Sequence, residues 1–266
     1  MLECVINISE GRQLDAIGEI RRIIGHDVMD IHSDFHHHRS VFTLVGASAP
    51  RKLAELSAQK FNLNEHVGVH PRIGIIDVVP FVPLENATMS QAIEARNEFA
   101  EFAASELQIP SFVYGPEREL PEIRKRAFVD LQPDFGPSKA HPTAGAICVG
   151  ARPILVAYNV WLKDSTIEDG KRIAKEIRSR QVRTLGLQLG NEIQVSMNLI
   201  SPDECSPEFV FDEIAKRAEI SRAELVGLVP ARVLATIKKS RWAELDLNNE
   251  KTIEWCLATR NRAKAT

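Results

Sequence analysis

The first half of the chain alternates between the residue spacings of strands and those of helices. Five apolar residues recur at helical spacing and predict a helix with one buried face: Leu14, Ile17, Ile20, Ile23 and Ile24. A second helix is predicted over Pro50–Phe61, because proline favours the first turn of a helix. Strands are predicted on either side of these helices, over Glu3–Ile8, Val28–Ile31, Val41–Val45 and Ile73–Val79. The order β-α-β-β-α-β predicts a split βαβ unit.

Further elements are predicted to extend this sheet. Apolar residues from Ala92 to Ala103 share one face of a helix that begins at Ser90, and Ser111–Tyr114 follows as a short strand. The segment Leu120–Ala144 is rich in proline, glycine and charge and shows little periodicity, so we expect it to be mainly loop.

The second half repeats the same order of elements. Ser165 and Glu168 have the spacing of a capping box before one helix, and Ser206 precedes a proline at the start of another. The predicted strands are Pro153–Trp161, Thr184–Leu189, Glu192–Leu199 and Glu224–Val229, and a terminal helix is expected over Asn248–Arg262. The fold class is therefore α/β (α+β), with two ferredoxin-like βαββαβ-type subdomains, residues 1–149 and 150–266, and a ligand groove between them.

The composition of the chain limits the classes of molecule that we expect the protein to bind. The chain has 266 residues, with 33 basic and 36 acidic side chains and a formal charge of -3, so no basic field recruits nucleic acid or an anionic membrane. It contains no apolar run of the ~20 residues that a membrane span needs, and no signal peptide, so we expect a cytoplasmic protein that acts on small molecules. Its four widely spaced cysteines fit core positions better than disulfides or a zinc site.

The stretch from His66 to Pro83 holds the densest candidate chemistry. His70 lies before Pro71, which disfavours helical geometry at the histidine, and a run of β-branched residues follows. Histidine can exchange protons near neutral pH, so His70 is the candidate acid or base. The end of the first strand, with Asn7, Ser9 and Glu10, could lie beside it.

A histidine-rich loop is the second candidate site. It contains His32, His36, His37 and His38 with Asp34 and Arg39. Adjacent side chains in an extended loop point to opposite sides, so a complete set of metal ligands is not expected there. A metal-dependent hydrolase remains an alternative at this point.

The segment from Gly136 to Gly145 is the third candidate. Its glycines, prolines and lysine could offer backbone donors and charge to an extended ligand, or the segment could simply connect two parts of the fold. The chain has no Gly-x-Gly-x-x-Gly, phosphate-loop or Gly-x-Ser-x-Gly motif, which disfavours dinucleotide, nucleoside triphosphate and serine-hydrolase chemistry.

Several motifs, in order along the chain, resemble those of the formiminotransferase family, whose members include the formiminotransferase domain of formiminotransferase-cyclodeaminase. They are Glu3–Gly11, Arg39–Gly46, His70–Phe81, Pro133–Pro137, Gly145–Arg152, Gln194–Leu199 and Glu224–Pro230. The resemblance implies two α/β subdomains with folate between them. It also implies transfer of a formimino group from N-formiminoglutamate to tetrahydrofolate, the co-substrate. No metal is expected, because the sequence shows no well-formed set of metal ligands.

The resemblance also implies roles for residues of this chain. His70 matches the family's catalytic histidine, as a general acid and base. The segment that contacts folate matches Gly136, Pro137, Ser138, Lys139, Ala140, His141, Pro142, Thr143, Ala144 and Gly145. Asn7, Asp34, Arg39 and Arg72 complete the expected binding residues. The carboxylates of glutamate and of the folate tail are expected on Arg39, Arg72, Lys139 and Arg152, because arginine suits carboxylate geometry.

Partners and alternatives follow from the same comparison. The chain ends soon after the second subdomain, so we expect a separate cyclodeaminase to use the product, and a homodimer is the expected assembly. Ile6, Ile8, His38 and a shorter stretch over residues 124–133 depart from the family pattern. These departures leave two alternatives: a glutamate formyltransferase that acts on 5-formyltetrahydrofolate, and a folate-binding paralogue without turnover.

Overall fold

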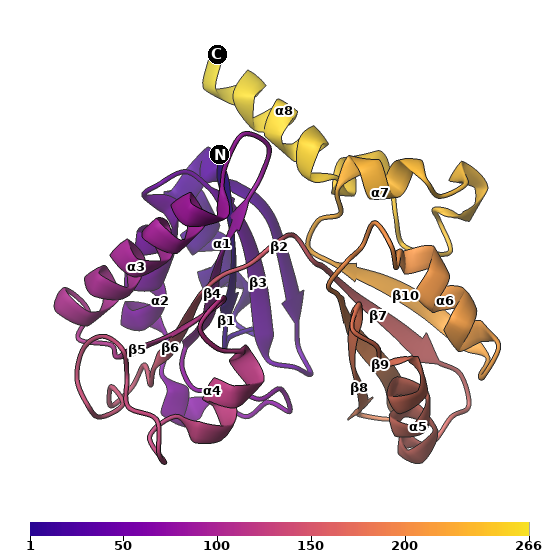
Figure 1. Cartoon of the computed structure of the whole chain (residues 1–266), viewed down its shortest axis with the longest axis horizontal. Coiled ribbons are helices and arrows are strands. Elements are labelled where there is room, and N and C mark those ends of the chain that lie inside the picture. The colour runs from indigo at the N-terminus through magenta and orange to yellow at the C-terminus, as the bar shows by residue number, and fades with distance from the viewer. Residues whose placement is uncertain (266) are drawn as a thin grey trace. The chain divides into compact units, whose positions relative to one another are not determined.

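The computed structural model describes residues 1–265, which form two compact units (Figure 1). The first unit is Met1–Pro153 and the second begins at Ile154. Each unit contains a β-α-β-β-α-β series, so the expected α+β class with two such repeats is confirmed. No helix in residues 1–265 has the length and apolar composition needed to cross a membrane.

The first unit is built on a six-stranded sheet in the order β2-β3-β1-β4-β6-β5. Its split βαβ part comprises β1 (Leu2–Ile8), α1 (Leu14–Ile24), β2 (Val28–Asp34), β3 (Arg39–Val45), α2 (Ala49–Lys60) and β4 (Ile76–Pro83). The extension comprises α3 (Met89–Ser105), β5 (Ser111–Tyr114), α4 (Leu120–Arg126) and β6 (Ile147–Ala151). Strands β1 to β4 pair antiparallel, whereas β6 lies parallel to both β4 and β5.

Side chains of β4 reach two separate clusters in this unit. Val79 belongs to the main core with Ile20 of α1, Leu53 of α2 and Phe99 of α3. Val78, its neighbour, packs instead in a smaller cluster that contains Ile123 of α4. Successive side chains of a strand point to opposite faces, so α4 covers the face opposite to α1, α2 and α3.

The second unit has a four-stranded antiparallel sheet in the order β10-β7-β9-β8. Its elements are β7 (Val156–Leu162), α5 (Ile167–Ile177), β8 (Val182–Leu189), β9 (Glu192–Leu199), α6 (Pro207–Ala215), β10 (Ile220–Val226), α7 (Ala231–Ala235) and α8 (Ile253–Ala265). Short 3₁₀ turns occupy Gly25–Asp27, Leu63–Glu65, Lys239–Arg241 and Asn249–Lys251. Thr166 caps α5 through a capping box with Asp169.

The structure corrects three expectations about elements. The segment Leu120–Ala144 begins with a helix, Leu120–Arg126, and is loop as expected only from residue 127 onward. Ile147–Ala151, where no strand was expected, forms β6 in the interior of the sheet. The expected strand Ile73–Val79 begins only at Ile76, because the amide of Ile75 donates to the carbonyl of Ala144 and the amide of Ile73 donates to the side chain of Asp77.

Candidate active site

A bulge in β4 places Asp77 at the centre of a polar cluster. Asn7 of β1 pairs with Val78 and Ile8 pairs with Ile76, so Asp77 is the extra residue on β4. Bulges bend a strand and redirect a side chain, and they recur next to active sites. The Asp77 carboxylate is completely buried and accepts a hydrogen bond from the amide of Ile73 at 2.9 Å.

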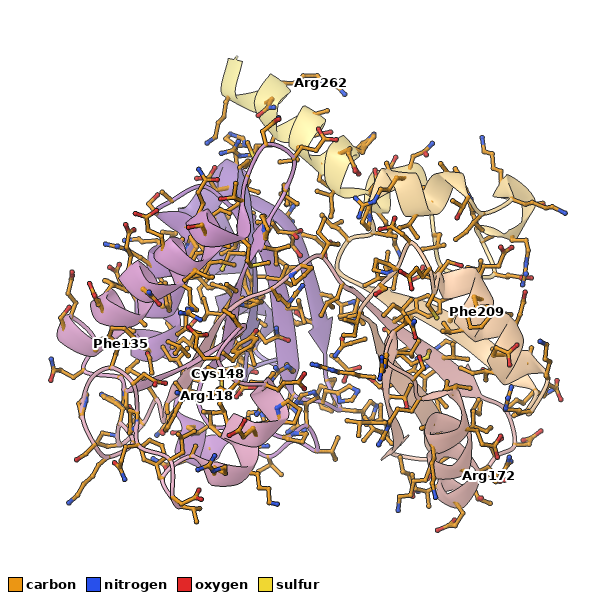
Figure 2. The ribbon with its side chains drawn as sticks, in the orientation of Figure 1. Arg118, Phe135, Cys148, Arg172, Phe209 and Arg262 are labelled. Atoms are coloured by element: carbon orange, nitrogen blue, oxygen red, sulfur yellow. The ribbon has the colours of Figure 1, made fainter. Side chains whose placement is uncertain are left out.

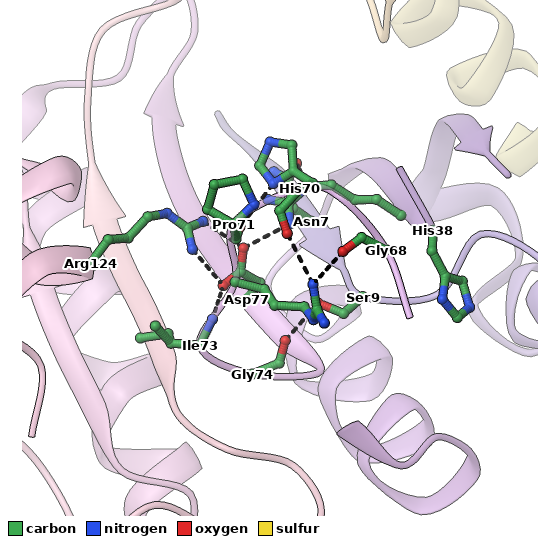
Figure 3. A network of polar contacts seen from close by, with 12 residues as sticks. Asn7, Ser9, His38, Gly68, His70, Pro71, Ile73, Gly74, Asp77 and Arg124 are labelled. Carbon is green, nitrogen blue, oxygen red and sulfur yellow. Dashed lines mark hydrogen bonds and ion pairs between the residues drawn. The ribbon is translucent and has the colours of Figure 1, made fainter. Parts of the chain in front are cut away.

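Two arginines from different elements bind the Asp77 carboxylate. Arg39, at the start of β3, donates from Nη1 to Oδ2 at 2.7 Å, and its Nε donates to Oδ1 of Asn7 at 3.0 Å. Arg124 of α4 donates from Nη2 to the same Oδ2 at 2.6 Å and from Nη1 to Oδ1 at 3.2 Å (Figure 3). Despite the burial of Asp77, the positive charges of Arg39 and Arg124 lower the pKa of its carboxyl below the usual range.

The loop that leads into Ile73 carries His70. Arg72 folds back along this loop and donates to the carbonyl oxygens of Gly68, His70 and His66 at 3.0, 3.1 and 3.2 Å. Nδ1 of His70 lies 2.8 Å from the carbonyl oxygen of Pro71. A carbonyl can only accept, so Nδ1 carries the proton and Nε2 of the neutral ring keeps its lone pair.

The surroundings of His70 favour this neutral form. Burial and the positive charges of Arg39 and Arg124 lower the pKa of His70 to about 3, although the Asp77 carboxylate opposes them. The His37 ring lies edge-on to that of His70, with a centroid distance of 5.8 Å. His70 is therefore held as a neutral imidazole with its lone pair at Nε2.

A second pair of histidines, His38 and His66, stabilises the loop that carries His70. The rings of His38 and His66 stack at 4.1 Å, and Nε2 of His66 donates to the carbonyl of His38 at 2.7 Å. Glu10 holds Nε2 of His38 at 3.0 Å and also accepts from the amides of Arg12 and Gln13. Glu10 thus connects the end of β1 to the turn between β2 and β3. His38 of that turn contacts His66 of the loop that carries His70.

The histidine-rich turn has a structural arrangement of its own. His32 lies on β2 and His36 is exposed in the turn, whereas His37 and His38 are buried. Asp34 accepts from the amide of His37 at 2.6 Å, which closes the turn. Across residues 1–265, no three histidine, cysteine, aspartate or glutamate side chains are grouped in a way that could hold a metal ion.

The segment Gly136–Gly145 is anchored at both ends and exposed in the middle. Arg118, labelled in Figure 2, pairs with Asp134 at 2.8 Å just before the segment. At the other end, Gly145 bridges to Gly74, and a Cβ atom on Gly74 would lie 2.1 Å from the carbonyl oxygen of Ala146. This close approach requires glycine and ties the segment to the residues that follow His70.

Residues 138–140 form a continuous exposed stretch of the segment, which includes the Lys139 side chain, and Gly136 and Pro142 are exposed too. Nδ1 of His141 accepts from the amides of Thr143 and Ala144, and the carbonyl of Thr143 accepts from the amide of Leu63 at 2.7 Å. The turn that follows Lys139 is therefore ordered by its own histidine.

The expected site residues fall into two groups in the structure. Arg39 donates to both Asn7 and Asp77, the charge of Asp77 acts on His70, and Gly145 joins the same region through Gly74. In contrast, Asp34 closes a turn, and Arg72 uses its guanidinium on loop carbonyls. Burial lowers the pKa of Arg152, and its neighbours Tyr114, Glu3 and Cys4 oppose that shift.

Sequence reasoning gave no role to Asp77 and did not consider Arg124. Asp77 lies in a quoted motif, and a buried carboxylate in an apolar strand is a recognisable signal. Arg124 gave no such signal, because its segment was expected to be loop.

The family model and the relatives that this chain matches point to the same protein family. Residues 1–152 match the family model described as the formiminotransferase domain, N-terminal subdomain. The glutamate formimidoyltransferase of Streptococcus pyogenes serotype M1 is 35% identical over 89% of this chain and 91% of its own length, and that of Thermoplasma acidophilum is 35% identical over 90% and 91%. The formimidoyltransferase-cyclodeaminase of Dictyostelium discoideum is 33% identical over 88% of this chain, which spans 51% of that protein. The chain belongs to the formiminotransferase family and is a transferase.

Proposed function

We propose that this enzyme transfers a formimino group from N-formiminoglutamate to tetrahydrofolate, giving 5-formiminotetrahydrofolate and glutamate. Similarity to two glutamate formimidoyltransferases over most of both chains supports this activity. The observation that carries the chemical assignment is the hydrogen bond from Nδ1 of His70 to the carbonyl of Pro71, which leaves Nε2 as the proton acceptor.

The reaction needs one proton to be removed and one to be supplied. N5 of tetrahydrofolate attacks the amidine carbon of N-formiminoglutamate and must lose its proton as the new C–N bond forms. Nε2 of His70 accepts that proton, and the resulting imidazolium returns it to the glutamate nitrogen as the old C–N bond breaks. General acid–base catalysis of this kind contributes about 10²–10⁴-fold, and the remainder of the rate comes from the positioning of two substrates.

The same proposal assigns folate to the segment Gly136–Gly145. Its middle is exposed, and its far end is hydrogen-bonded to the residues that follow His70. Such an arrangement suits a long ligand that has its reactive ring near the histidine and its acidic tail near Lys139.

The product is expected to pass to a cyclodeaminase. Relatives from Dictyostelium discoideum and Sus scrofa are named formimidoyltransferase-cyclodeaminases, and this chain covers 51% of each. In those proteins the second named activity accompanies the first in one chain, so this enzyme and a cyclodeaminase would act in sequence.

A direct assay tests the proposal. The purified enzyme is incubated with tetrahydrofolate and N-formiminoglutamate, and 5-formiminotetrahydrofolate and glutamate are quantified by mass spectrometry. We expect equal amounts of the two products. Transfer from 5-formyltetrahydrofolate to glutamate alone would identify a formyltransferase, and folate binding without any transfer would identify a binding protein.

A further inference from the structure

The ion-pair cluster beside His70 holds more positive than negative charge. Arg39, Asp77 and Arg124, here called the two-arginine cluster, contain two guanidinium groups and one carboxylate. The side chains are 10%, 0% and 17% exposed. Cys148 and Tyr114 lie near Arg124 and would add negative charge there if they ionised. Burial raises the pKa of both groups, so they remain neutral. The cluster therefore has a net charge of one positive unit in a largely buried position.

Part of the donor capacity of this cluster is not used. Arg39 donates from Nε to Asn7 and from Nη1 to Asp77, and both terminal nitrogens of Arg124 donate to Asp77. Nη2 of Arg39 and Nε of Arg124 make no hydrogen bond to any residue from 1 to 265. A charge in excess of its partner is costly to bury, and an added anion would relieve that cost.

The anion must be one that lies close to the reacting atoms. The amide of Ile73, three residues after His70, donates to Asp77, and Figure 3 shows Asp77 and Arg124 in the same polar network as His70. In N-formiminoglutamate, the α-carboxylate is attached to the carbon that bears the leaving nitrogen. In tetrahydrofolate, the carboxylates lie at the far end of the molecule from N5, beyond the aminobenzoyl ring. Only the first arrangement puts a carboxylate beside the proton-transfer site.

We propose that the two-arginine cluster binds the α-carboxylate of N-formiminoglutamate and that Arg124 is a specificity-determining residue. This inference rests on the proposed formimino transfer. Asp77 acts as a positioning residue that holds both guanidinium groups, and its bond to the amide of Ile73 fixes their place relative to the loop of His70. A carboxylate bound here also offsets the positive charge near His70, which would make Nε2 a stronger base when substrate is present.

The test uses two small ligands that differ only in the α-carboxylate. Binding of L-glutamate and of 4-aminobutyrate to the whole enzyme is measured by titration calorimetry, with the wild type and with Arg124→Gln. We expect the wild type to bind glutamate more tightly than 4-aminobutyrate. Loss of one partner of a desolvated charge pair should weaken glutamate by about 30-fold or more in the variant, with little change for 4-aminobutyrate.

Arg126→Gln is the matched control, because Arg126 is an arginine of the same helix that pairs at the surface with Glu122 and Asp130. It should bind both ligands as the wild type does. Steady-state assays should show a raised KM for N-formiminoglutamate in Arg124→Gln and an unchanged KM for tetrahydrofolate. If Arg124→Gln does not fold, Arg124→Lys keeps the charge without the planar fork and should still weaken glutamate selectively.

Two results would overturn the inference. One is wild-type glutamate affinity in a folded Arg124 variant, and the other is an equal loss for glutamate and 4-aminobutyrate. These outcomes differ from failure of the proposed function, in which the wild-type enzyme itself would transfer no formimino group.

Discussion

Replacement of Asp77 by asparagine is the sharpest test of the packing around the site. The change keeps the size of the side chain but removes the charge that balances Arg39 and Arg124. Because Asp77 is completely buried, the substitution leaves two largely buried guanidinium groups without their counter-charge. Breaking a buried pair in this way costs about 3–5 kcal/mol of unfolding free energy, a large part of the ~5–15 kcal/mol that stabilises a typical domain.

Urea denaturation with a probe for each unit measures the effect. Trp161, Trp242 and Trp255 all follow residue 153, so tryptophan fluorescence reports on the second unit, while hydrogen exchange at β1 and β4 reports on the first. With an m-value of about 3 kcal/mol per molar urea, the first-unit midpoint should fall by about 1–1.7 M.

Arg124→Gln is the control for the Asp77 variant. It leaves Arg39 and Asp77 as a balanced pair, so it should cost less free energy than Asp77→Asn. A loss below about 1 kcal/mol for Asp77→Asn would refute the reasoning, because a surface ion pair costs no more than that. A larger loss for Arg124→Gln than for Asp77→Asn would refute it as well.

Three further predictions concern charge, metal and pH. Lys139→Ala should weaken polyglutamylated folate more than the monoglutamate in titrations of both, since a longer tail brings more carboxylates within reach of the exposed ammonium; equal losses would place Lys139 elsewhere. Activity should survive exhaustive chelation, because we assign proton transfer to His70; chelator-sensitive activity with stoichiometric metal by elemental analysis would contradict this. Folded His70 has its pKa lowered from 6.5 to about 3, so between these values only the unfolded chain binds that proton, and stability falls as pH is lowered. The free energy of unfolding is measured from pH 6.5 to pH 4 for the wild type and for His70→Asn. Its slope against pH should be shallower in the variant by up to about 1.4 kcal/mol per pH unit. Identical slopes for the two proteins would contradict the lowered pKa of His70.

The regular elements of both units could be predicted because their signals are local. The spacing of Ile17 and Ile20 places a buried face on α1, and both lie in the core. The family, too, was identified correctly from motifs spread along the whole chain. In contrast, β6 depends on pairing with β4 and β5, and a short apolar run such as Ile147–Ala151 does not by itself distinguish a strand from a buried connection.

The parts of the candidate site that escaped prediction are those formed by long-range contacts. His70 was singled out from its neighbours in sequence, and its role stays a prediction. The position of Asp77 depends on the β1–β4 register, which the sequence pattern does not specify to one residue. Arg124 reaches Asp77 from α4, 47 positions away in sequence, and only the packing of α4 on the sheet brings the two together.

The central claim is that His70 moves the proton during formimino transfer, and one comparison tests it most directly. Formation of 5-formiminotetrahydrofolate by His70→Asn and by the wild type is measured together with the Kd for tetrahydrofolate. The account predicts a rate about 10²–10⁴-fold lower with an unchanged Kd, because the ring is assigned to proton transfer and not to binding. A wild-type rate in the folded variant, or a loss of folate affinity as large as the loss of rate, would contradict it.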